Sequence, residues 1–262
     1  MSKQLQLISA SYLPEYTKQA DIDWRKVFHR FRAKDKFTAE DFDYYLIASS
    51  LYSSKIEGNT LDVNSFFRNR GTKKSPKKKE VEEIEDLAVA YQFASANLLN
   101  QDNFLKTHKL LAKGLLPAKE RGAIRKDAMW VRDAKTLKPV YGAVEPEFVD
   151  AEMIRFFADI SALLKRDLKH KEIFYYASMI HLWLVMIHPF GDGNGRSARL
   201  LEKWFLASKL GMAAWSVNSE KYYWDHRHVY YQNIALGYNY YSLHWGRCIP
   251  FLLMLPMALE SI

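Results

Sequence analysis

Cysteine is almost absent from this chain, and so are the marks of secretion or membrane insertion. The single cysteine of the 262 residues, Cys248, excludes an intramolecular disulfide framework and fits a reducing compartment. Its apolar neighbours at 249–253 predict a buried thiol rather than a nucleophile. The N-terminal residues lack the long apolar core of a signal peptide. The most apolar run, 173–187, is short for a bilayer span and contains His181. We therefore expect a soluble, cytoplasmic protein with no membrane partner.

The two common sequence signatures of phosphate-binding loops are also missing. The chain has no Gly-x-x-x-x-Gly-Lys-Ser/Thr and no Gly-x-Gly-x-x-Gly after a strand. Positive charge is nevertheless in excess, because 38 lysines and arginines outnumber 30 acidic residues, for a formal net charge of +8. This excess favours anionic partners, either nucleotides or nucleic acid. Much of it lies in the run 68–79. No aromatic residue between Lys73 and Lys79 could stack a base, so we interpret this run as a solvated loop.

Apolar residues recur mostly at helical spacing, which predicts a mainly α-helical fold in a single domain. We expect this domain to span 38–262, after a partly helical N-terminal segment at 1–37. Within that segment, residues 1–20 are expected to be irregular, and a short amphipathic helix is expected at 23–32. Further helices are expected at 80–99, 104–116, 147–166, 171–187 (the central buried helix), 196–210, 219–231 and 245–259.

Two local patterns define other elements. Thr38 and Asp41 have the spacing of a capping box, which predicts a helix at about 39–58 that ends at Gly58. The β-rich runs 128–131 and 139–142, with polar residues between them, predict a β-hairpin. An exposed edge of this hairpin could pair with an extended peptide by strand addition. Within helix 104–116, His108 is expected to have a core or capping role.

The stretch from His188 to Arg199 carries most of the chain's candidate chemistry. Its Gly193-Asn194-Gly195 segment permits a turn with positive φ, and backbone N–H groups at such a turn before a helix form an anion cradle. Arg196 and Arg199 lie three positions apart in the opening turn of that helix, so both can face one anion. Cations at a helix N-terminus oppose the dipole, which favours a polyphosphate partner that neutralises them.

A metal-ligand candidate and a base candidate lie in the same stretch. Asp192 is well placed beside the cradle to bind a Mg²⁺ ion that bridges phosphate oxygens. His188 ends a rigid buried helix, which is a fixed platform for a general base. One histidine and one aspartate make a poor zinc set, which disfavours a metallohydrolase. Each feature is more often structural when it stands alone, but their convergence favours a phosphate-handling active site.

At these residues the sequence resembles the Fic (Fido) family, whose signature is His-Pro-Phe-x-Asp/Glu-Gly-Asn-Gly-Arg-x-x-Arg. Every fixed position is matched between His188 and Arg199. The resemblance extends to His181 on the preceding helix, to Gly122-x-x-Arg125 before the hairpin, and to the closing helices that include 219–231 and Trp245. It covers roughly residues 38–255. It implies a Fic-type helical domain with a central buried helix, an active-site loop that leads into a helix N-terminus, and a β-hairpin flap.

The resemblance also implies an activity, the transfer of AMP from ATP to a serine, threonine or tyrosine hydroxyl of a target protein, with Mg²⁺ as cofactor and pyrophosphate as product. His188 would deprotonate the hydroxyl, and Asp192 would bind Mg²⁺ on the α- and β-phosphates. The outer phosphates would be held by Arg196 and Arg199. The remaining implied contacts are with the nucleotide at Phe190, Gly193, Asn194, Gly195, Tyr230 and Tyr231, and with the target backbone at the flap residues Met129, Trp130 and Val131.

A second match lies N-terminal to the first. Ser53-x-x-x-Glu57-Gly58 resembles the inhibitory motif of the family. In physical terms, Glu57 could pair bidentately with Arg199 and so prevent that arginine from holding the γ-phosphate. The motif therefore implies an autoinhibited enzyme whose inhibitory helix is the one at 39–58. If Glu57 has no such role, it is an exposed glutamate at a helix end.

Three alternatives to AMP transfer stay open. Glu57 could orient a water that removes AMP from a modified protein. The enzyme could transfer another phosphoryl-containing group, although two arginines suit the outer phosphates of a nucleoside triphosphate. The chain could also be a non-catalytic regulator that binds protein or nucleic acid, which the basic run supports. No DNA-binding helix pair is recognisable in the sequence, however, so we do not expect nucleic acid as a partner. Self-modification and a homodimer also stay open.

Overall fold

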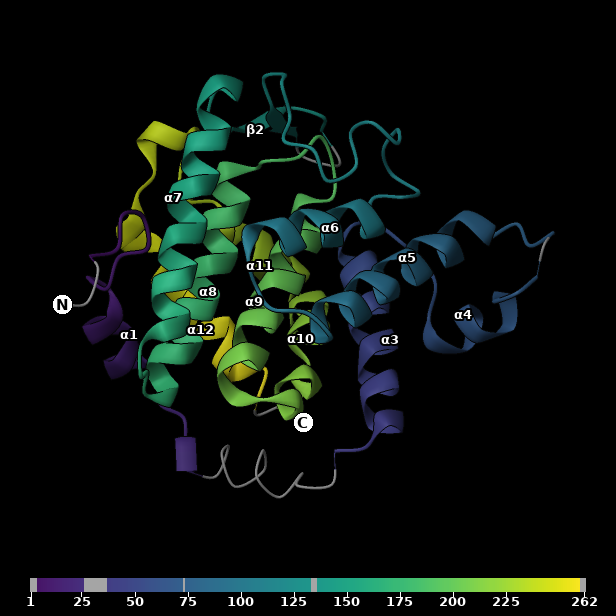
Figure 1. Cartoon of the computed structure of the whole chain (residues 1–262), viewed down its shortest axis with the longest axis horizontal. Helices are drawn as coiled ribbons and strands as arrows, with labels where there is room; N and C mark the ends of the chain where they lie inside the picture. Colours follow the sequence, from purple (N-terminus) through teal and green to yellow (C-terminus); the bar gives the residue numbers. More distant parts are fainter. Residues whose placement is uncertain (1–3, 26–36, 73, 133–135, 260–262) are drawn as a thin grey trace.

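The computed structural model describes residues 4–25, 37–72, 74–132 and 136–259. Its architecture is mainly α-helical with one small antiparallel sheet, as predicted (Figure 1). The helices are α1 (Leu13–Gln19), α3 (Ala39–Ile56), α4 (Val63–Asn69), α5 (Lys78–Ser95), α6 (Gln101–Leu111), α7 (Pro146–Lys165), α8 (His170–Ile187), α9 (Asn194–Leu210), α10 (Ser219–Asp225), α11 (Arg227–Ile234) and α12 (Ile249–Met257). Short 3₁₀ turns lie at Met212–Ser216, Tyr240–Ser242 and Trp245–Arg247, and the strands are β1 (Trp130–Arg132) and β2 (Pro139–Gly142).

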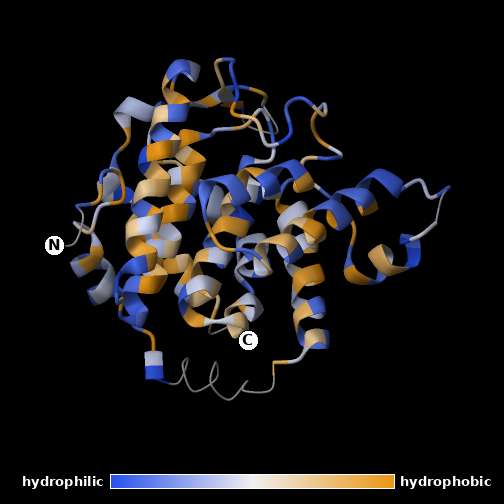
Figure 2. Ribbon diagram, in the orientation of Figure 1, coloured by the Kyte–Doolittle hydropathy of each residue, from blue (hydrophilic) through white to orange (hydrophobic). Residues whose placement is uncertain are grey.

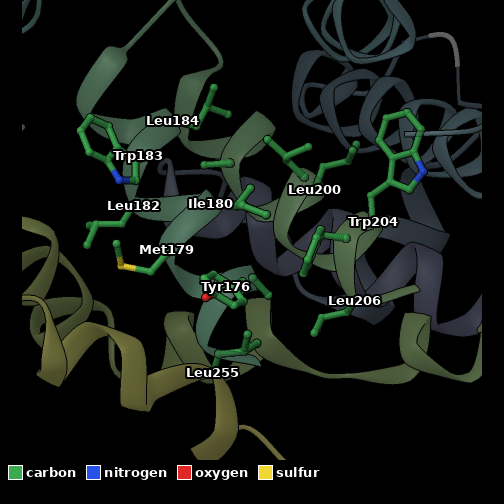
Figure 3. Packing of buried hydrophobic residues seen from close by; sticks show 14 of the residues in the cluster. Tyr176, Met179, Ile180, Leu182, Trp183, Leu184, Leu200, Trp204, Leu206 and Leu255 are labelled. Atoms are coloured by element: carbon green, nitrogen blue, oxygen red, sulfur yellow. The ribbon is translucent and has the colours of Figure 1, made fainter. Parts of the chain in front are cut away.

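Helix α8 is the centre of the core, as the sequence predicted. Nearly all of its side chains from Ile173 to Ile187 are buried, and it packs against α9, α7, α12 and α1. Figure 3 shows Ile180 of α8 beside Leu200 of α9, with Trp204 further along α9. Burying a large apolar side chain stabilises a fold by roughly 1.5–3 kcal/mol. Because α8 and α9 are anchored on both sides, the loop that joins them has a rigid base.

Helix α3 begins and ends as the local sequence predicted. The Thr38 side chain accepts a hydrogen bond from the Asp41 N–H at 3.1 Å, and the Asp41 carboxylate accepts one from the Thr38 N–H at 3.0 Å. The helix ends where Gly58 adopts a φ of 111°. Its buried face packs on α5 and α10 and reaches α9. This packing brings the C-terminal end of α3 close to the loop between α8 and α9.

The prediction that residues 1–20 are irregular is wrong. Leu13–Gln19 forms helix α1, which has a proline in its first turn and buries Tyr16 against the Tyr175 ring at a centroid distance of 5.4 Å. Before it, the N–H groups of residues 6–8 donate to the carboxylate of Asp159 on α7 at 2.7–3.0 Å. These are tertiary contacts, so the local sequence carries little signal for them. The helix expected at 23–32 lies mostly outside the described residues.

The basic run is only partly the loop that was expected. Asp62 caps helix α4 by accepting the Ser65 N–H at 2.7 Å, so Arg68 is helical, and α5 already begins at Lys78. A small apolar cluster, separate from the main core, joins α4 to α5 and α3 through Leu51, Leu61, Phe66, Val81 and Ile84. We call α4 and the start of α5 the α4–α5 lobe, which projects from the body in Figure 1. Figure 2 shows that the start of α5 is largely hydrophilic.

Other helix boundaries moved by up to five residues, and two expected helices are divided. The helix expected at 104–116 ends at Leu111, and that expected at 219–231 is broken at His226 into α10 and α11. The helix expected at 245–259 begins with a separate 3₁₀ turn. Cys248 is buried, as predicted, and burial raises the pKa of its thiol to about 12. No helix among the described residues is long and apolar enough to cross a membrane.

The predicted hairpin is present. Trp130 of β1 pairs with Gly142 of β2, and the register shifts between Val131 and Arg132. A Cβ at Gly142 would lie 3.0 Å from the Trp130 ring, so a larger residue there would require the indole to shift by a few tenths of an ångström. On its other side, the Gly142 N–H donates to the Tyr238 carbonyl at 2.8 Å. The outer side of β2 is therefore partly paired with the segment that follows α11.

Candidate active site

The loop between α8 and α9 starts with a strained residue. His188 has φ 51° and ψ 59°, a left-handed conformation that a residue with a Cβ rarely adopts and that tends to mark functional sites. Arg125 holds this backbone in place, since its Nε donates to the His188 carbonyl at 2.7 Å and its N–H donates to the Pro189 carbonyl at 3.0 Å. Arg125 also donates to the carbonyls of Asp127 and Val144, which connects the loop to both sides of the hairpin.

The His188 ring has the protonation state of a base. Its Nδ1 lies 3.2 Å from the Val185 carbonyl, which can only accept, so the proton sits on Nδ1 and Nε2 has a free lone pair. Burial lowers the pKa of His188 to about 4 and outweighs the opposing effect of the hydrogen bond to Val185; the positive charge of Arg125 lowers it further. The imidazole is therefore neutral at pH 7 and able to take a proton.

His108 is fully buried, which confirms its expected core role. It also contacts the backbone of the loop at Asp192, which the sequence did not reveal. The Gly122 N–H donates to Nδ1 at 2.9 Å, so Nε2 carries the proton and donates to the Asp192 carbonyl at 2.9 Å. The ring stacks on Phe190 at a centroid distance of 3.5 Å. Burial lowers the pKa of His108 to about 4, which keeps the ring neutral.

The glycine-rich turn has the predicted geometry. Gly193 has φ 79° and directly precedes α9, so the first N–H groups of that helix face the turn. The Asn194 side chain closes the turn on itself, because its Oδ1 accepts from the Phe190 N–H at 3.0 Å and its Nδ2 donates to the Phe190 carbonyl at 2.8 Å. Phe190 is fully buried. The side chains of Phe190 and Asn194 thus support the loop, and the anion cradle is made of backbone.

Arg199 is fully buried and has four hydrogen bonds. Its Nε and Nη2 donate to the Ser53 hydroxyl at 2.8 Å and the Ser53 carbonyl at 3.0 Å, Nη2 donates to Glu57 Oε1 at 2.6 Å, and Nη1 donates to the Tyr230 hydroxyl at 3.2 Å. The prediction of a bidentate pair with Glu57 is therefore wrong, because Ser53 and Tyr230 take the other donors. Burial opposes the charge on Arg199, but Tyr230 and Glu57 outweigh it and raise the pKa.

The Glu57 carboxylate lies directly over the start of α9. A Cβ at Gly195 would be 2.5 Å from Glu57 Oε1, so a glycine at 195 leaves room for this carboxylate. The Glu57 side chain is 29% exposed. Burial raises its pKa, but the charges of Arg199 and Arg196 more than offset this, and the net shift is downward. Glu57 is thus ionised at neutral pH and occupies the space beside the predicted anion cradle.

Arg196 has a partner that sequence reasoning missed. Its Nη1 donates to Glu83 of α5 in a very short contact, and its Nη2 lies 3.3 Å from Asp192 Oδ1. The Asp192 side chain is 52% exposed, and Oδ1 also accepts the Gly193 N–H at 2.5 Å. No local pattern marks Glu83, one of several glutamates in the acidic first half of α5.

The structure assigns different surroundings to the two tyrosines that were expected to contact the nucleotide. Tyr230 is buried, and its hydroxyl connects Arg199 to Nε2 of His181 at 3.0 Å; His181 in turn contacts Glu202 at 2.9 Å. Tyr231 is 40% exposed and donates from its hydroxyl to the Ile56 carbonyl at 3.1 Å. Tyr231 is therefore the one open to a ligand, whereas Tyr230 supports Arg199.

Asp192 supplies a single half-exposed carboxylate next to the turn. Among the described residues, no group of three or more histidines, cysteines, aspartates or glutamates could hold a metal ion. A closed protein cage for zinc or calcium is thus not formed by them. A half-exposed carboxylate beside an anion cradle does suit Mg²⁺, which is commonly held by one or two carboxylates, water and substrate phosphates. Asp192 would be that carboxylate.

The sequence is similar to curated proteins named protein adenylyltransferase Fic. Protein adenylyltransferase Fic of Culex quinquefasciatus is 30% identical over 196 residues, which are 71% of this chain and 36% of that protein. The protein of the same name from Aedes aegypti is 29% identical over 199 residues, with the same shares. This chain thus spans little more than a third of the length of these relatives.

Solved structures share the fold. A Fic family protein from Desulfovibrio desulfuricans G20 aligns with a TM-score of 0.73 at 21% identity, over 99% of this chain and 75% of that one. Fic-1 of C. elegans aligns with a TM-score of 0.59 at 20% identity, over 95% and 68%. Residues 98–206 match the Fic/DOC family model, and this segment includes α6, the hairpin, α7, α8, the loop and most of α9. The chain therefore contains a Fic domain.

Proposed function

We propose that this protein is an adenylyltransferase, which transfers AMP from ATP to a serine, threonine or tyrosine hydroxyl of a target protein and releases pyrophosphate. The observation that carries the proposal is the pairing of a neutral His188, with Nε2 free, and a backbone anion cradle that is followed by Arg196 and Arg199. The names of the related proteins agree with this reaction.

The residues have complementary roles in this reaction. Nε2 of His188 takes the proton of the target hydroxyl as its oxygen attacks the α-phosphorus, and the bond from that phosphorus to the leaving pyrophosphate breaks. The N–H groups at the start of α9 hold the α-phosphate, and Arg196 and Arg199 hold the outer phosphates. Mg²⁺ bound at Asp192 would neutralise phosphate charge. Catalysis is then mostly positioning and electrostatic stabilisation.

The target is proposed to dock on the hairpin. Trp130 is 57% exposed, and the β2 side of the hairpin already contacts the segment at 238–239. Within the described residues, β1 pairs with no strand other than β2, so its outer edge is the place for an extended target segment next to Met129, Trp130 and Val131. Because Arg125 contacts both Asp127 and His188, this edge has a defined position relative to the base.

The resting protein is proposed to be autoinhibited by Glu57. Its carboxylate is bonded to Arg199 and lies over Gly195, so the γ-phosphate of ATP cannot reach Arg199 until Glu57 leaves. The release of an ionised carboxylate from a buried arginine is unfavourable without a competing anion. Ser53 and Tyr230 do not need to move, since they hold the arginine from other sides.

Mass spectrometry of the Glu57→Gly protein after incubation with ATP and Mg²⁺ tests both proposals. We expect a mass increase of one AMP group on the protein itself or on an added target, and much less on the wild type. The matched control is Glu57→Gly combined with His188→Ala, which should stay unmodified. An unmodified Glu57→Gly protein, with any target in a cell lysate also unmodified, would contradict the proposed activity.

A second candidate reaction is the removal of AMP from a modified target. It is favoured by the position of Glu57, which is ionised and beside the cradle, where it could orient a water toward the phosphorus. Incubation of an AMP-modified target with wild type and with Glu57→Ala separates the two reactions. Loss of AMP only with the wild type would support removal.

A further inference from the structure

The first arginine of the cradle is also paired with carboxylates, one of which comes from helix α5. The Arg196 guanidinium is almost completely buried, and its two terminal nitrogens are directed at Glu83 and Asp192. Its Nε is buried and has no partner among the described residues. An arginine in this state has one unsatisfied donor and two carboxylates in the positions that phosphate oxygens would need.

In the absence of Mg²⁺, the charges of the side chains on the two arginines oppose a polyphosphate. Arg196 and Arg199 contribute two positive charges, whereas Glu57, Glu83 and Asp192 contribute three negative charges, so the net charge of the five side chains is −1. Burial raises the pKa of Glu83, and the nearby charge of Glu57 acts in the same direction against the pull of Arg196. The two glutamates thus share one site, and removal of Glu57 alone leaves the remaining four side chains without a net positive charge.

The two glutamates are also connected through side-chain contacts of the segment that follows Glu57. Asn59 follows the inhibitory helix, and its Nδ2 donates to the Glu80 carbonyl at 2.9 Å and to Glu83 Oε2 at 3.5 Å. The Thr60 N–H and hydroxyl donate to the Glu80 carboxylate at 2.7 Å. The segment just after Glu57 is therefore attached to the turn of α5 that carries Glu83, within the α4–α5 lobe (Figure 1).

We propose that Glu83 is a second inhibitory carboxylate, which occupies Arg196 as Glu57 occupies Arg199 and thereby lowers the affinity of the site for nucleoside triphosphates. This inference rests on the proposed function, since it concerns the same phosphate site. The small apolar cluster joins the lobe to α3, and Asn59 joins the segment after Glu57 to Glu83, so a shift of the lobe relative to α9 would move both carboxylates. Full activity then requires the release of both arginines.

Nucleotide binding to four proteins tests this proposal: wild type, Glu57→Gly, Glu83→Gln and the double variant. Isothermal titration would use ATP with Mg²⁺, and AMP as the ligand without outer phosphates. We expect Glu83→Gln in the Glu57→Gly background to tighten ATP binding about tenfold, the scale of one charge-assisted hydrogen bond, and to change AMP binding less than twofold. The matched control is Glu82→Gln on the same helix, because Glu82 is exposed and pairs only with Lys78 at 3.6 Å among the described residues.

Each outcome decides the question. Unchanged or weaker ATP binding by Glu83→Gln would overturn the proposal and would make Glu83 a support that positions Arg196. An equal gain with AMP, or with Glu82→Gln, would also overturn it. Glu83→Ala serves as the second variant if the glutamine protein does not fold. AMP transfer without a Glu83 effect on ATP affinity would refute only this inference, whereas tight ATP binding without AMP transfer would refute only the proposed function.

Discussion

The contact between Glu57 and Arg199 should be measurable as stability as well as activity. Removal of the carboxylate leaves a fully buried guanidinium with Ser53 and Tyr230 as its remaining partners. A net hydrogen bond to a charged group contributes about 1.5–3 kcal/mol. Because the Glu57 side chain is 29% exposed, the lower part of that range applies, and we expect a loss of about 2 kcal/mol.

This loss predicts a specific pattern of melting temperatures. In a chain of this size, about 1 kcal/mol shifts Tm by roughly 2–4 °C, so Glu57→Gly should melt about 4–8 °C below the wild type. A ligand at one hundred times its Kd stabilises the folded state by about 2.7 kcal/mol. ATP should therefore restore the variant to at least the Tm of the wild type, because its outer phosphates replace the missing carboxylate, and should shift the wild type much less.

Differential scanning fluorimetry with and without ATP and Mg²⁺ measures all four values. Glu57→Gln is the matched control for the backbone, since glycine at a helix end also changes the entropy of the unfolded chain. The glutamine variant should show the same response to ATP with a smaller change in its own Tm. An equal shift of wild type and both variants by ATP would refute the reasoning, because Glu57 would then not compete with the nucleotide.

Three further predictions concern the base, its support and the N-terminal segment. Burial lowers the pKa of His188 to about 4, so its base form persists well below the usual histidine range. The initial rate of AMP transfer by Glu57→Gly should therefore stay level from pH 8 to about 5.5 and fall only toward pH 4. A midpoint near pH 6.5 would contradict the assignment of His188 as the base. Arg125→Ala removes the contact that holds the His188 carbonyl, and should reduce kcat at least tenfold while the Kd for ATP, measured by titration, stays within twofold. Asp159→Asn weakens the acceptor for the N–H groups of residues 6–8. It should reduce the free energy of unfolding in urea by about 1–3 kcal/mol without altering the rate of AMP transfer. An unchanged midpoint of urea unfolding would show that this anchor is not needed for stability.

Short-range patterns predicted the parts of the fold that depend on neighbours in sequence. The capping box at Thr38, the stop at Gly58, the hairpin around Trp130 and the turn at Gly193 all form as expected. Helix α1 was missed because its stability comes from burial of Tyr16 on the core rather than from a helical pattern of its own.

The candidate site also has one part that neighbouring residues in the sequence determine and one part that depends on residues far apart in the chain. The stretch from His188 to Arg199 is continuous in the chain, so its residue types and their spacing are enough to indicate a base, an anion cradle and two arginines. Glu83, by contrast, lies 113 positions from Arg196, and His108 lies 84 positions from Asp192. No periodicity or motif connects residues at such separations.

The sequence by itself thus determined the chemistry that the loop can offer, because the turn, the helix start and the residue types are local properties. Only the tertiary structure decided which carboxylate opposes each arginine, since that depends on how α3 and α5 pack against α9. It also decided that Ser53 and Tyr230 accept hydrogen bonds from Arg199 N–H groups, one of which was expected to bind Glu57. Tyr230 therefore supports Arg199 instead of facing a ligand. Long-range packing assigns partners to polar groups, and in this site those partners set whether the phosphate cradle is open or closed.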